Sequence, residues 1–292
     1  MRSFYLSILK GVRDLSIFHA ILLGLIQGLT EFLPISSSGH LVAFQQIFAI
    51  PGASLTVDVA LHLGTLVAVF AFYWHDIINM IKEFFLWIGE LLRIRNPRKN
   101  SDSGYRKMMI MIIIATIPTA LIGLLFNDIF EKAFSSIYVV GFTLLITGTL
   151  LWLSNKIVKG RKQAKDISLA DAVTVGLLQG MAITPGISRS GSTIFAGMLR
   201  GFNMELATKF SFLLSIPAIL GAAVLEGKKI LEQGLELADG FPVLIGFVVA
   251  AVSGFFAIKL LVNLINKRKL HYFSYYCWGA GILIILYSLV LH

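Results

Sequence analysis

The sequence predicts an all-α, polytopic integral membrane protein that forms a single membrane domain over residues 1–292. Hydrophobic residues make up 57% of the chain and charged residues only 14%, and the mean hydropathy of +0.82 is far above that of ordinary soluble domains. Apolar stretches of about 20 residues, the length that crosses a bilayer core of about 30 Å, recur along most of the sequence.

Six of these stretches are bounded by polar or charged residues and are predicted to span the membrane. They cover 56–75, 107–127, 137–156, 207–226, 241–265 and 272–291. Two further apolar stretches, 16–48 and 168–200, have centres rich in glycine, serine and proline that would break a helix. Each is predicted to be a re-entrant hairpin, which enters the membrane and turns back. The segment 76–92 mixes charged and aromatic residues and fits a helix at the cytoplasmic interface.

Basic residues gather in three short loops, at 93–107, 156–165 and 267–269. Lysine and arginine are enriched in cytoplasmic loops, so these three loops are predicted to face the cytoplasm of a cell inner membrane. The loops 127–136 and 226–240 and both termini then lie outside. This pattern accounts for the net charge of +9 with membrane lipids as the surroundings and no nucleic-acid partner. The single cysteine, Cys277, excludes an intrachain disulfide.

The two predicted hairpins are copies of one another. Residues 24–28 (GLIQG) match 176–180 (GLLQG), and 35–39 (ISSSG) match 187–191 (ISRSG), at one offset, since 176 − 24 and 188 − 36 are both 152. Each copy holds one hairpin and three spans, with repeat 1 at about 16–156 and repeat 2 at about 168–291. An odd number of spans inverts the second copy relative to the first, as in many transporters. We therefore expect the two serine-rich turns to meet near the midplane.

The first turn contains a carboxylate at membrane depth. Gln27 and Glu31 lie four residues apart and share one face of a helix. An ionisable side chain inside hydrocarbon is costly unless it is paired or binds an ion, so Glu31 is a candidate site residue. Oxygen ligands suit Mg²⁺ or Ca²⁺, which makes Glu31 and Gln27 candidate metal ligands, with a substrate phosphate supplying further oxygens.

The residues that follow Glu31 suit phosphate chemistry. Ser36, Ser38 and Gly39 offer hydroxyl and backbone N–H groups that can bind an anion, especially where a helix begins. Ser37 is the preferred nucleophile, with His40 as its base. The sequence leaves two alternatives open, in which His40 attacks phosphorus directly or activates water.

The second turn places an arginine among hydroxyl groups. Arg189 keeps its charge in any environment and binds phosphate oxygens in a fork. Its neighbours are the expected substrate-binding residues Gly186, Ser188, Ser190 and Thr193. An interfacial arginine that reaches water is the alternative. Three more residues are left open: Asp58 and His62, four apart at the start of the first span, either extend the site or cap the helix, and Arg200 is either a site residue or an anchor.

Both turns resemble the signatures of the bacitracin resistance protein family (BacA/UppP), the undecaprenyl-diphosphatases. The first signature is matched by Gln27, Glu31, Pro34, Ser36, Ser37, Gly39 and His40, and the second by every residue from Pro185 to Thr193. The resemblance covers essentially the whole chain. Many members have glutamate in place of Gln27, and the neutral amide weakens cation binding at that position.

The resemblance implies a phosphatase. Such an enzyme removes the terminal phosphate of undecaprenyl diphosphate, which recycles the lipid carrier for peptidoglycan synthesis and confers bacitracin resistance. A divalent cation, Mg²⁺ or Ca²⁺, is the expected cofactor, a polyprenyl diphosphate lipid the expected partner, and a homodimer is left open. The alternative from another class is a secondary transporter or lipid flippase, because inverted repeats with broken helices are its usual framework.

Overall fold

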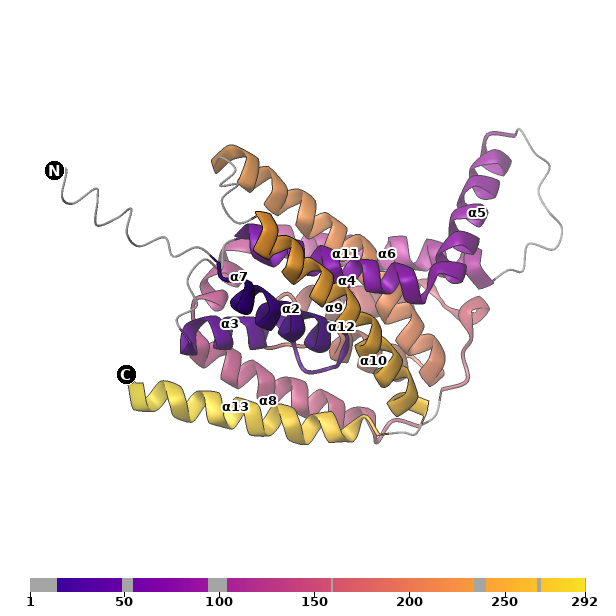
Figure 1. Ribbon diagram of the computed structural model, residues 1–292. Helices are drawn as coiled ribbons and strands as arrows, with labels where there is room; N and C mark the ends of the chain where they lie inside the picture. The colour runs from indigo at the N-terminus through magenta and orange to yellow at the C-terminus, as the bar shows by residue number, and fades with distance from the viewer. Residues whose placement is uncertain are drawn as a thin grey trace.

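The computed structural model describes residues 15–48, 55–93, 104–158, 160–233, 240–266 and 269–291, and throughout these ranges the elements are helices (Figure 1). In chain order they are α2 (Ile17–Phe32), α3 (Ser37–Ile47), α4 (Leu55–Phe72), α5 (Trp74–Leu91), α6 (Gly104–Leu125), α7 (Asn127–Phe134), α8 (Ile137–Ser154), the short 3₁₀-helix η1 (Ala164–Asp166), α9 (Leu169–Met181), α10 (Arg189–Leu199), α11 (Met204–Gln233), α12 (Gly240–Asn266) and α13 (His271–Leu291). The predicted basic loops at 93–107, 156–165 and 267–269, and the outer loop at 226–240, lie partly outside the described residues.

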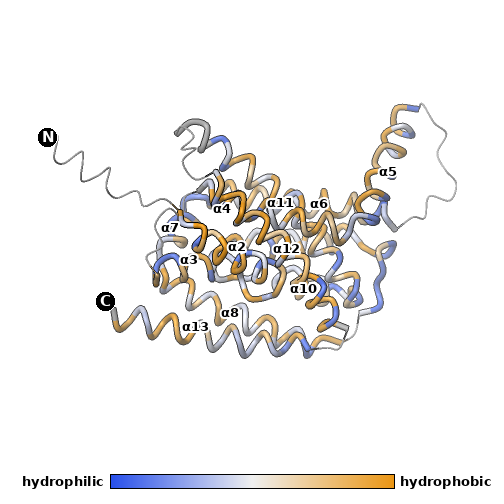
Figure 2. Tube along the Cα trace, viewed as in Figure 1, coloured by the Kyte–Doolittle hydropathy of each residue, from blue (hydrophilic) through white to orange (hydrophobic). Residues whose placement is uncertain are grey.

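The predicted all-α membrane class is confirmed. Five described helices, α6, α8, α11, α12 and α13, have the length and composition of membrane spans. The pair α4 and α5 makes a sixth if it is counted as one broken span, and it bends by 85° at Tyr73. Figure 2 shows the helices in hydrophobic colours over most of their length, with hydrophilic colours concentrated at ends and connections. Large apolar side chains such as Leu283 and Val290 remain exposed, as expected of a surface that contacts lipid.

Two predicted loops on one side of the membrane are partly helical. The segment 127–136 contains α7, and α11 continues past the predicted end of its span to Gln233, so the prediction of a loop over all of 226–240 is wrong. Hydropathy marks where a chain leaves the bilayer, and a helix with internally satisfied backbone hydrogen bonds can continue into water. The charged residues after 225 therefore do not end α11.

The segment predicted to be an interfacial helix is α5, which projects away from the helical body (Figure 1). Arg106 at the start of α6 ties α5 down. Its Nη1 and Nη2 atoms donate to the two carboxylate oxygens of Glu90 at 2.8 and 3.1 Å, and its Nε donates to Glu83 at 3.2 Å. Such a fork fixes direction as well as distance. The position of α5 at the cytoplasmic surface stays a prediction.

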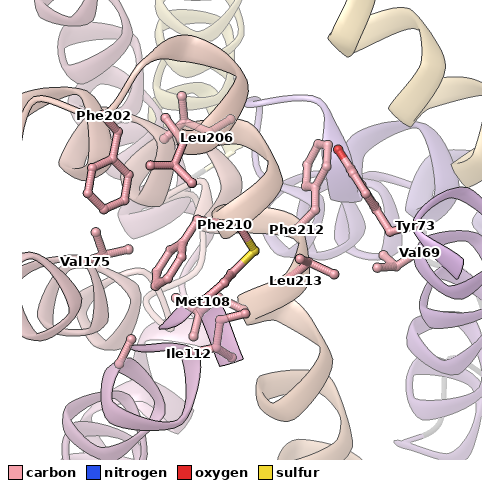
Figure 3. Close-up of a cluster of buried hydrophobic side chains, with 14 of the residues drawn as sticks. Val69, Tyr73, Met108, Ile112, Val175, Phe202, Leu206, Phe210, Phe212 and Leu213 are labelled. Carbon is pink, nitrogen blue, oxygen red and sulfur yellow. The ribbon is translucent and has the colours of Figure 1, made fainter. Parts of the chain in front are cut away.

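The main hydrophobic cluster joins α4, α6, α9, α10, α11 and α12. Figure 3 shows Phe210 of α11 beside Met108 and Ile112 of α6, and Phe212 beside Tyr73 at the end of α4. Phe210 and Phe212 of α11 thus contact two different helices of the first half of the chain. Within a membrane such packing acts mainly through van der Waals contact, because lipid is as apolar as the core.

Equivalent glycines give both halves the same helix contact. A Cβ on Gly24 of α2 would lie 2.6 Å from the carbonyl oxygen of Gly246 on α12, and one on Gly176 of α9 would overlap the carbonyl oxygen of Ala115 on α6. Small residues such as these glycines allow two membrane helices to approach closely. A hydroxyl bridges each pair, because Ser253 of α12 donates to the Gly24 carbonyl at 3.4 Å and Thr119 of α6 to the Gly176 carbonyl at 2.9 Å.

α2 of the first predicted repeat therefore packs against α12 of the second, and α9 of the second packs against α6 of the first. Such reciprocal packing is expected where two copies interlock. The repeat limits at about 16–156 and 168–291, the re-entrant course of the two hairpins and the inverted orientation of the copies in a membrane stay predictions. What the helices do provide is a fixed framework that brings the breaks at 33–36 and 182–188 together.

Candidate active site

The two helix breaks end in the same capping arrangement. Ser36 precedes α3, and its Oγ accepts a hydrogen bond from the Gly39 N–H at 3.3 Å. Ser188 precedes α10, and its Oγ accepts from the Gly191 N–H at 3.1 Å. Side chains of this type satisfy N–H groups that the first turn of a helix leaves free. The residue after each cap, Ser37 or Arg189, is the first residue of its helix.

Glycines let the two turns touch. A Cβ on Gly39 would lie 2.9 Å from the Cα of Gly186, and one on Gly191 would lie 3.3 Å from the Cβ of Pro34. Gly39 and Gly191 are repeat equivalents, and so are Pro34 and Gly186, so the contact is reciprocal. Gly186 has φ +89°, a conformation that favours glycine. The turns meet as the sequence predicts.

Ser36 holds a conformation that is rare for a residue with a side chain. Its φ is 70° and its ψ 99°, outside the favoured regions for L-residues. Backbone of this kind costs on the order of 1–3 kcal/mol and is concentrated at functional sites. Its Oγ lies 3.3 Å from the Oγ of Ser38, and in the second turn the Oγ atoms of Ser188 and Ser190 lie 3.2 Å apart.

Glu31 is the centre of the polar cluster between the turns. Arg189 Nη2 donates to its Oε1 at 2.6 Å, while Ser37 Oγ and Gln27 Nε2 donate to its Oε2 at 2.5 and 3.0 Å. Only 6% of the Glu31 side chain and 16% of the Arg189 side chain are exposed. A buried carboxylate needs this compensation of charge and hydrogen bonds. The structure thus unites three predicted catalytic residues from opposite halves of the chain.

His40, the fourth predicted catalytic residue, makes different contacts. Its Nδ1 lies 2.7 Å from the Ser36 carbonyl oxygen, which can only accept, so Nδ1 carries the proton. Its Nε2 then accepts from the hydroxyl of Tyr276 on α13 at 2.7 Å, and the two rings stack. The recorded partner of the Ser37 hydroxyl is Glu31 and not His40. The role of His40 as the base for Ser37 stays a prediction.

The predicted substrate-binding hydroxyls of the second turn are buried and engaged with protein. Thr193 Oγ1 donates to the Arg189 carbonyl at 2.8 Å and lies 2.6 Å from Ser211 Oγ on α11. Ser190 Oγ donates to the Leu33 carbonyl at 3.3 Å, which joins the turns again. In this state these groups stabilise the turn, and their contact with substrate stays a prediction.

Several supporting residues escaped the sequence analysis. Thr143 and Thr147 of α8 donate to the carbonyls of Pro185 and Gly186 at 2.6 and 2.8 Å and hold the second turn from behind. Their spacing of four within an apolar span is a signal that could have identified them, because such residues share a helix face. Tyr276 and Ser211 carried no comparable signal.

One oxygen in the cluster fits a cation. Gln27 is fully buried, its Nε2 donates to Glu31, and its Oε1 has no hydrogen-bond partner. A buried oxygen without a donor suits a hard cation or a bound water. The described residues contain no group of three or more His, Cys, Asp or Glu side chains placed to hold a metal. Gln27 Oε1 is therefore available to a cation, and a cation held by Gln27 and Glu31 stays a prediction.

Arg200 lies at the other end of α10 and belongs to a different cluster. Arg200 Nε and Lys162 Nζ donate to the two oxygens of Asp171, at 2.8 and 2.7 Å. Burial alone would raise the pKa of the Asp171 carboxyl, but the hydrogen bonds from Lys162, the Ser168 backbone and Arg200 outweigh burial and lower the pKa to about 2. A cavity of about 270 Å³ near this cluster is lined by Gly160, Phe202 and other residues outside the Glu31 cluster. Arg200 thus contacts Asp171 and not the Glu31 cluster, and its role as an anchor stays a prediction.

Fold and site together define a multi-pass membrane protein whose halves enclose a buried carboxylate, hydroxyl and guanidinium cluster suited to a phosphate group. The chain belongs to the family described as "Bacitracin resistance protein BacA", whose profile matches residues 20–283. This result confirms the resemblance on which the sequence analysis relied.

Curated relatives match over nearly their full length. A protein named undecaprenyl-diphosphatase from Alkaliphilus metalliredigens is 53% identical over 274 residues, which are 94% of this chain and 99% of that protein. Proteins with the same name from Halothermothrix orenii and Methanobrevibacter smithii are 47% and 45% identical, over 93% and 94% of this chain and 98% and 99% of their own lengths.

Proposed function

We propose that this protein hydrolyses undecaprenyl diphosphate to undecaprenyl phosphate and inorganic phosphate. The reaction would recycle the lipid carrier for peptidoglycan synthesis and confer bacitracin resistance. The observation that carries the proposal is the contact of Ser37 and Arg189 with the two oxygens of Glu31, at 2.5 and 2.6 Å. The names of the relatives point to the same reaction.

Substrate binding begins with Arg189. Its guanidinium, held by Glu31 before substrate arrives, can present its fork to oxygens of the terminal phosphate. As the phosphate takes over the positive charge, Glu31 loses a stabilising partner and becomes a stronger base. One exchange of partners therefore binds the substrate and activates the carboxylate.

The chemical step then proceeds from Ser37. Its Oγ attacks the terminal phosphorus while its proton passes to Glu31 Oε2, its hydrogen-bond partner. The bond from that phosphorus to the bridging oxygen breaks, and undecaprenyl phosphate leaves with the electron pair. Water then attacks the phosphoserine, the Ser37 oxygen takes the proton back from Glu31, and inorganic phosphate is released. Attack by His40 or by water remains the alternative to Ser37.

A divalent cation, Mg²⁺ or Ca²⁺, would be held by Gln27 Oε1 and Glu31 with the diphosphate oxygens. Bound there, it would neutralise charge on the transferring phosphate. Gln27 supports this assignment because its Oε1 is buried without a donor. The neutral amide contributes less affinity than a second carboxylate would.

The location is proposed to be the cell inner membrane, with the polyprenyl diphosphate entering from the lipid, and a homodimer stays a prediction. Hydrolysis is favoured over secondary transport or flipping because a hydroxyl, its hydrogen-bond acceptor and a phosphate-binding cation share one cluster. Transport alone does not require a hydroxyl placed 2.5 Å from a buried carboxylate.

The experiment is a phosphate-release assay in detergent with terminally radiolabelled substrate and rapid acid quenching. We expect wild-type protein to release phosphate and to accumulate acid-stable label on Ser37. The Ser37→Ala variant should lose about 1,000-fold or more in rate, as nucleophile variants do, while Ser38→Ala, next to it, should remain within about tenfold. Acid-labile, base-stable label would indicate His40 instead, and wild-type protein that releases no phosphate would refute the proposed function.

A further inference from the structure

A hydroxyl on α13 contacts the imidazole of His40. The Tyr276 hydroxyl donates to His40 Nε2 at 2.7 Å, and the two rings stack with their centroids 5.6 Å apart. The other ring nitrogen, Nδ1, donates to the Ser36 carbonyl at 2.7 Å. His40 thus joins α13, from the second half of the chain, to the residue that caps α3.

The other histidine near the first turn makes a different contact. His62 of α4 has its Nε2 4.0 Å from Glu31 Oε2. One turn earlier on α4, Asp58 accepts a hydrogen bond from Gln45 of α3 at 3.3 Å. His62 therefore faces the Glu31 cluster, whereas both ring nitrogens of His40 are engaged by other groups. This difference points to a role of His40 in holding the turn.

The capping residue that His40 contacts is strained, and its repeat equivalent is not. Ser36 has φ 70° and ψ 99°, whereas Ser188 has φ −69° and ψ 118°, an ordinary extended conformation. In both turns the cap carbonyl accepts from the backbone N–H four residues on, at 3.2 Å for His40 and 2.9 Å for its repeat equivalent Ser192. The imidazole bond is thus an addition at the strained cap. Strained backbone persists where its surroundings hold it, which gives this bond a purpose.

The Tyr276 hydroxyl fixes the position of the His40 ring. The partner of one imidazole nitrogen sets the tautomer and orientation of the whole ring. Because Nε2 accepts from Tyr276, the proton stays at Nδ1, where it faces the Ser36 carbonyl. Without the hydroxyl, Nε2 would lose the partner that the structure gives it. A ring that turns to find another partner would then lose its bond to Ser36.

The residue after Tyr276 fixes α13 against the same turn. Cys277 is fully buried, and its Sγ donates to the Pro34 carbonyl at 3.7 Å. It also packs against Ile35 and Leu151. Because the two residues are adjacent on one helix, this packing sets where the Tyr276 hydroxyl lies relative to the turn.

We propose that Tyr276 is a positioning residue that holds the first turn in its reactive conformation through His40. The proposal rests on the proposed function, in which Ser37 attacks phosphorus. Ser37 directly follows the strained cap and donates to Glu31 at 2.5 Å. A rotation at Ser36 would move this hydroxyl out of line with the carboxylate and with the phosphate. A misplacement of about 1 Å can cost about 100-fold in rate.

The test compares Tyr276→Phe with Tyr275→Phe in the phosphate-release assay. Tyr276→Phe keeps the stacked ring and removes the hydroxyl. We expect kcat to fall about 10- to 100-fold, with KM changed less than about threefold, because the reacting hydroxyl is misplaced while the phosphate-binding groups remain. Tyr275 is the matched control, since its ring contacts His271 and Trp278, and Tyr275→Phe should keep wild-type kcat.

A second measurement reads the His40 ring directly and needs no substrate. In nitrogen NMR spectra of histidine-labelled protein in detergent, the signals of His40 are those missing from His40→Gln. We expect the wild-type ring to carry its proton at Nδ1. Tyr276→Phe should also show the Nε2–H form, because its ring is released from Ser36, and the Tyr275→Phe spectrum should match wild type.

Two results would overturn the positioning role. One is a Tyr276→Phe variant with wild-type or higher kcat, which would mean that the hydroxyl contributes nothing or covers a nitrogen that catalysis needs free. The other is a slow variant whose His40 signals match wild type, because its defect would not pass through the ring. Wild-type protein that releases no phosphate would instead refute the proposed function, and the NMR comparison would still test the contact between Tyr276 and His40.

Discussion

The helix pairs α2–α3 and α9–α10, each interrupted by one of the two turns, share their backbone arrangement and differ in their side chains. Each has a capping serine, a pair of serine hydroxyls and a glycine that contacts the other turn. At the position after the cap, the first pair has Ser37 and the second Arg189. Glu31 corresponds to Ile183, so only the first pair carries a carboxylate. The scaffold was kept in both copies, while reactive and binding groups were divided between them.

A large effect on phosphate release should come from replacing Arg189, the binding group of the second pair. Arg189→Lys keeps a positive charge beside Glu31 but loses the fork, and we expect phosphate release to fall about 100-fold or more. Arg200→Ala, at the opposite end of the same helix, should keep activity within about threefold, since Arg200 contacts Asp171 instead. Near-normal phosphate release by Arg189→Lys would contradict the binding role.

The reciprocal glycine contact should be unequal in the two halves. A Cβ on Gly39 would lie 2.9 Å from backbone of Gly186, whereas one on Gly191 meets its nearest atoms at 3.2 to 3.3 Å. We therefore expect Gly39→Ala to destabilise the protein by about 2–3 kcal/mol and Gly191→Ala by about 1 kcal/mol, measured as thermal unfolding in detergent. Gly221→Ala is the control, because nothing lies within 4 Å of its Cβ position. Equal losses at both positions would contradict the asymmetry.

A further difference in stability should appear at the starts of α2 and α9. Ser16 caps α2 with His19 in its first turn, and Ser168 caps α9 with Asp171 at the equivalent position. Asp171→Asn should cost about 1–3 kcal/mol of stability, because Lys162 and Arg200 lose their counter-charge. His19→Ala should cost less than about 0.5 kcal/mol.

The Asp171 carboxylate should make the stability of the protein depend on pH. Its pKa is lowered from 3.8 to about 2, so the ionised form stabilises the fold. That contribution is complete above about pH 4 and is lost as the pH falls toward 2. Thermal unfolding of wild type and Asp171→Asn should therefore converge in acid, and a constant difference between pH 6 and pH 3 would argue against the ion cluster.

The sequence was most informative about the spans. Four predicted spans begin and end within three residues of the bounds of a helix, namely 107–127, 137–156, 241–265 and 272–291. Burial in lipid requires long apolar helices, so composition alone marks them. The helical continuation of α11 and the helix α7 were missed, because outside the bilayer hydropathy no longer reports on helix formation.

At the candidate site, the sequence identified the residues but not their pairing. The duplicated motifs located Ser37 and Arg189, and Glu31 stood out because charged groups at membrane depth are rare. The partner of the Ser37 hydroxyl was assigned to His40 by proximity in sequence, whereas the structure records Glu31 there. A helix break turns the chain, so neighbours in sequence can diverge and residues six apart can meet. Tyr276 and the α8 threonines come from distant helices, which no local pattern reveals.

The mutual contact of the two turns also bears on how such a molecule could have arisen. Two identical half-length ancestors could have met through the same glycines, but symmetry would then have placed the same side chain after both caps. Joining the halves into one polypeptide removed that restriction, because each turn could then mutate alone. A serine after one cap and an arginine after the other, both in contact with Glu31, require that twofold equivalence to be broken.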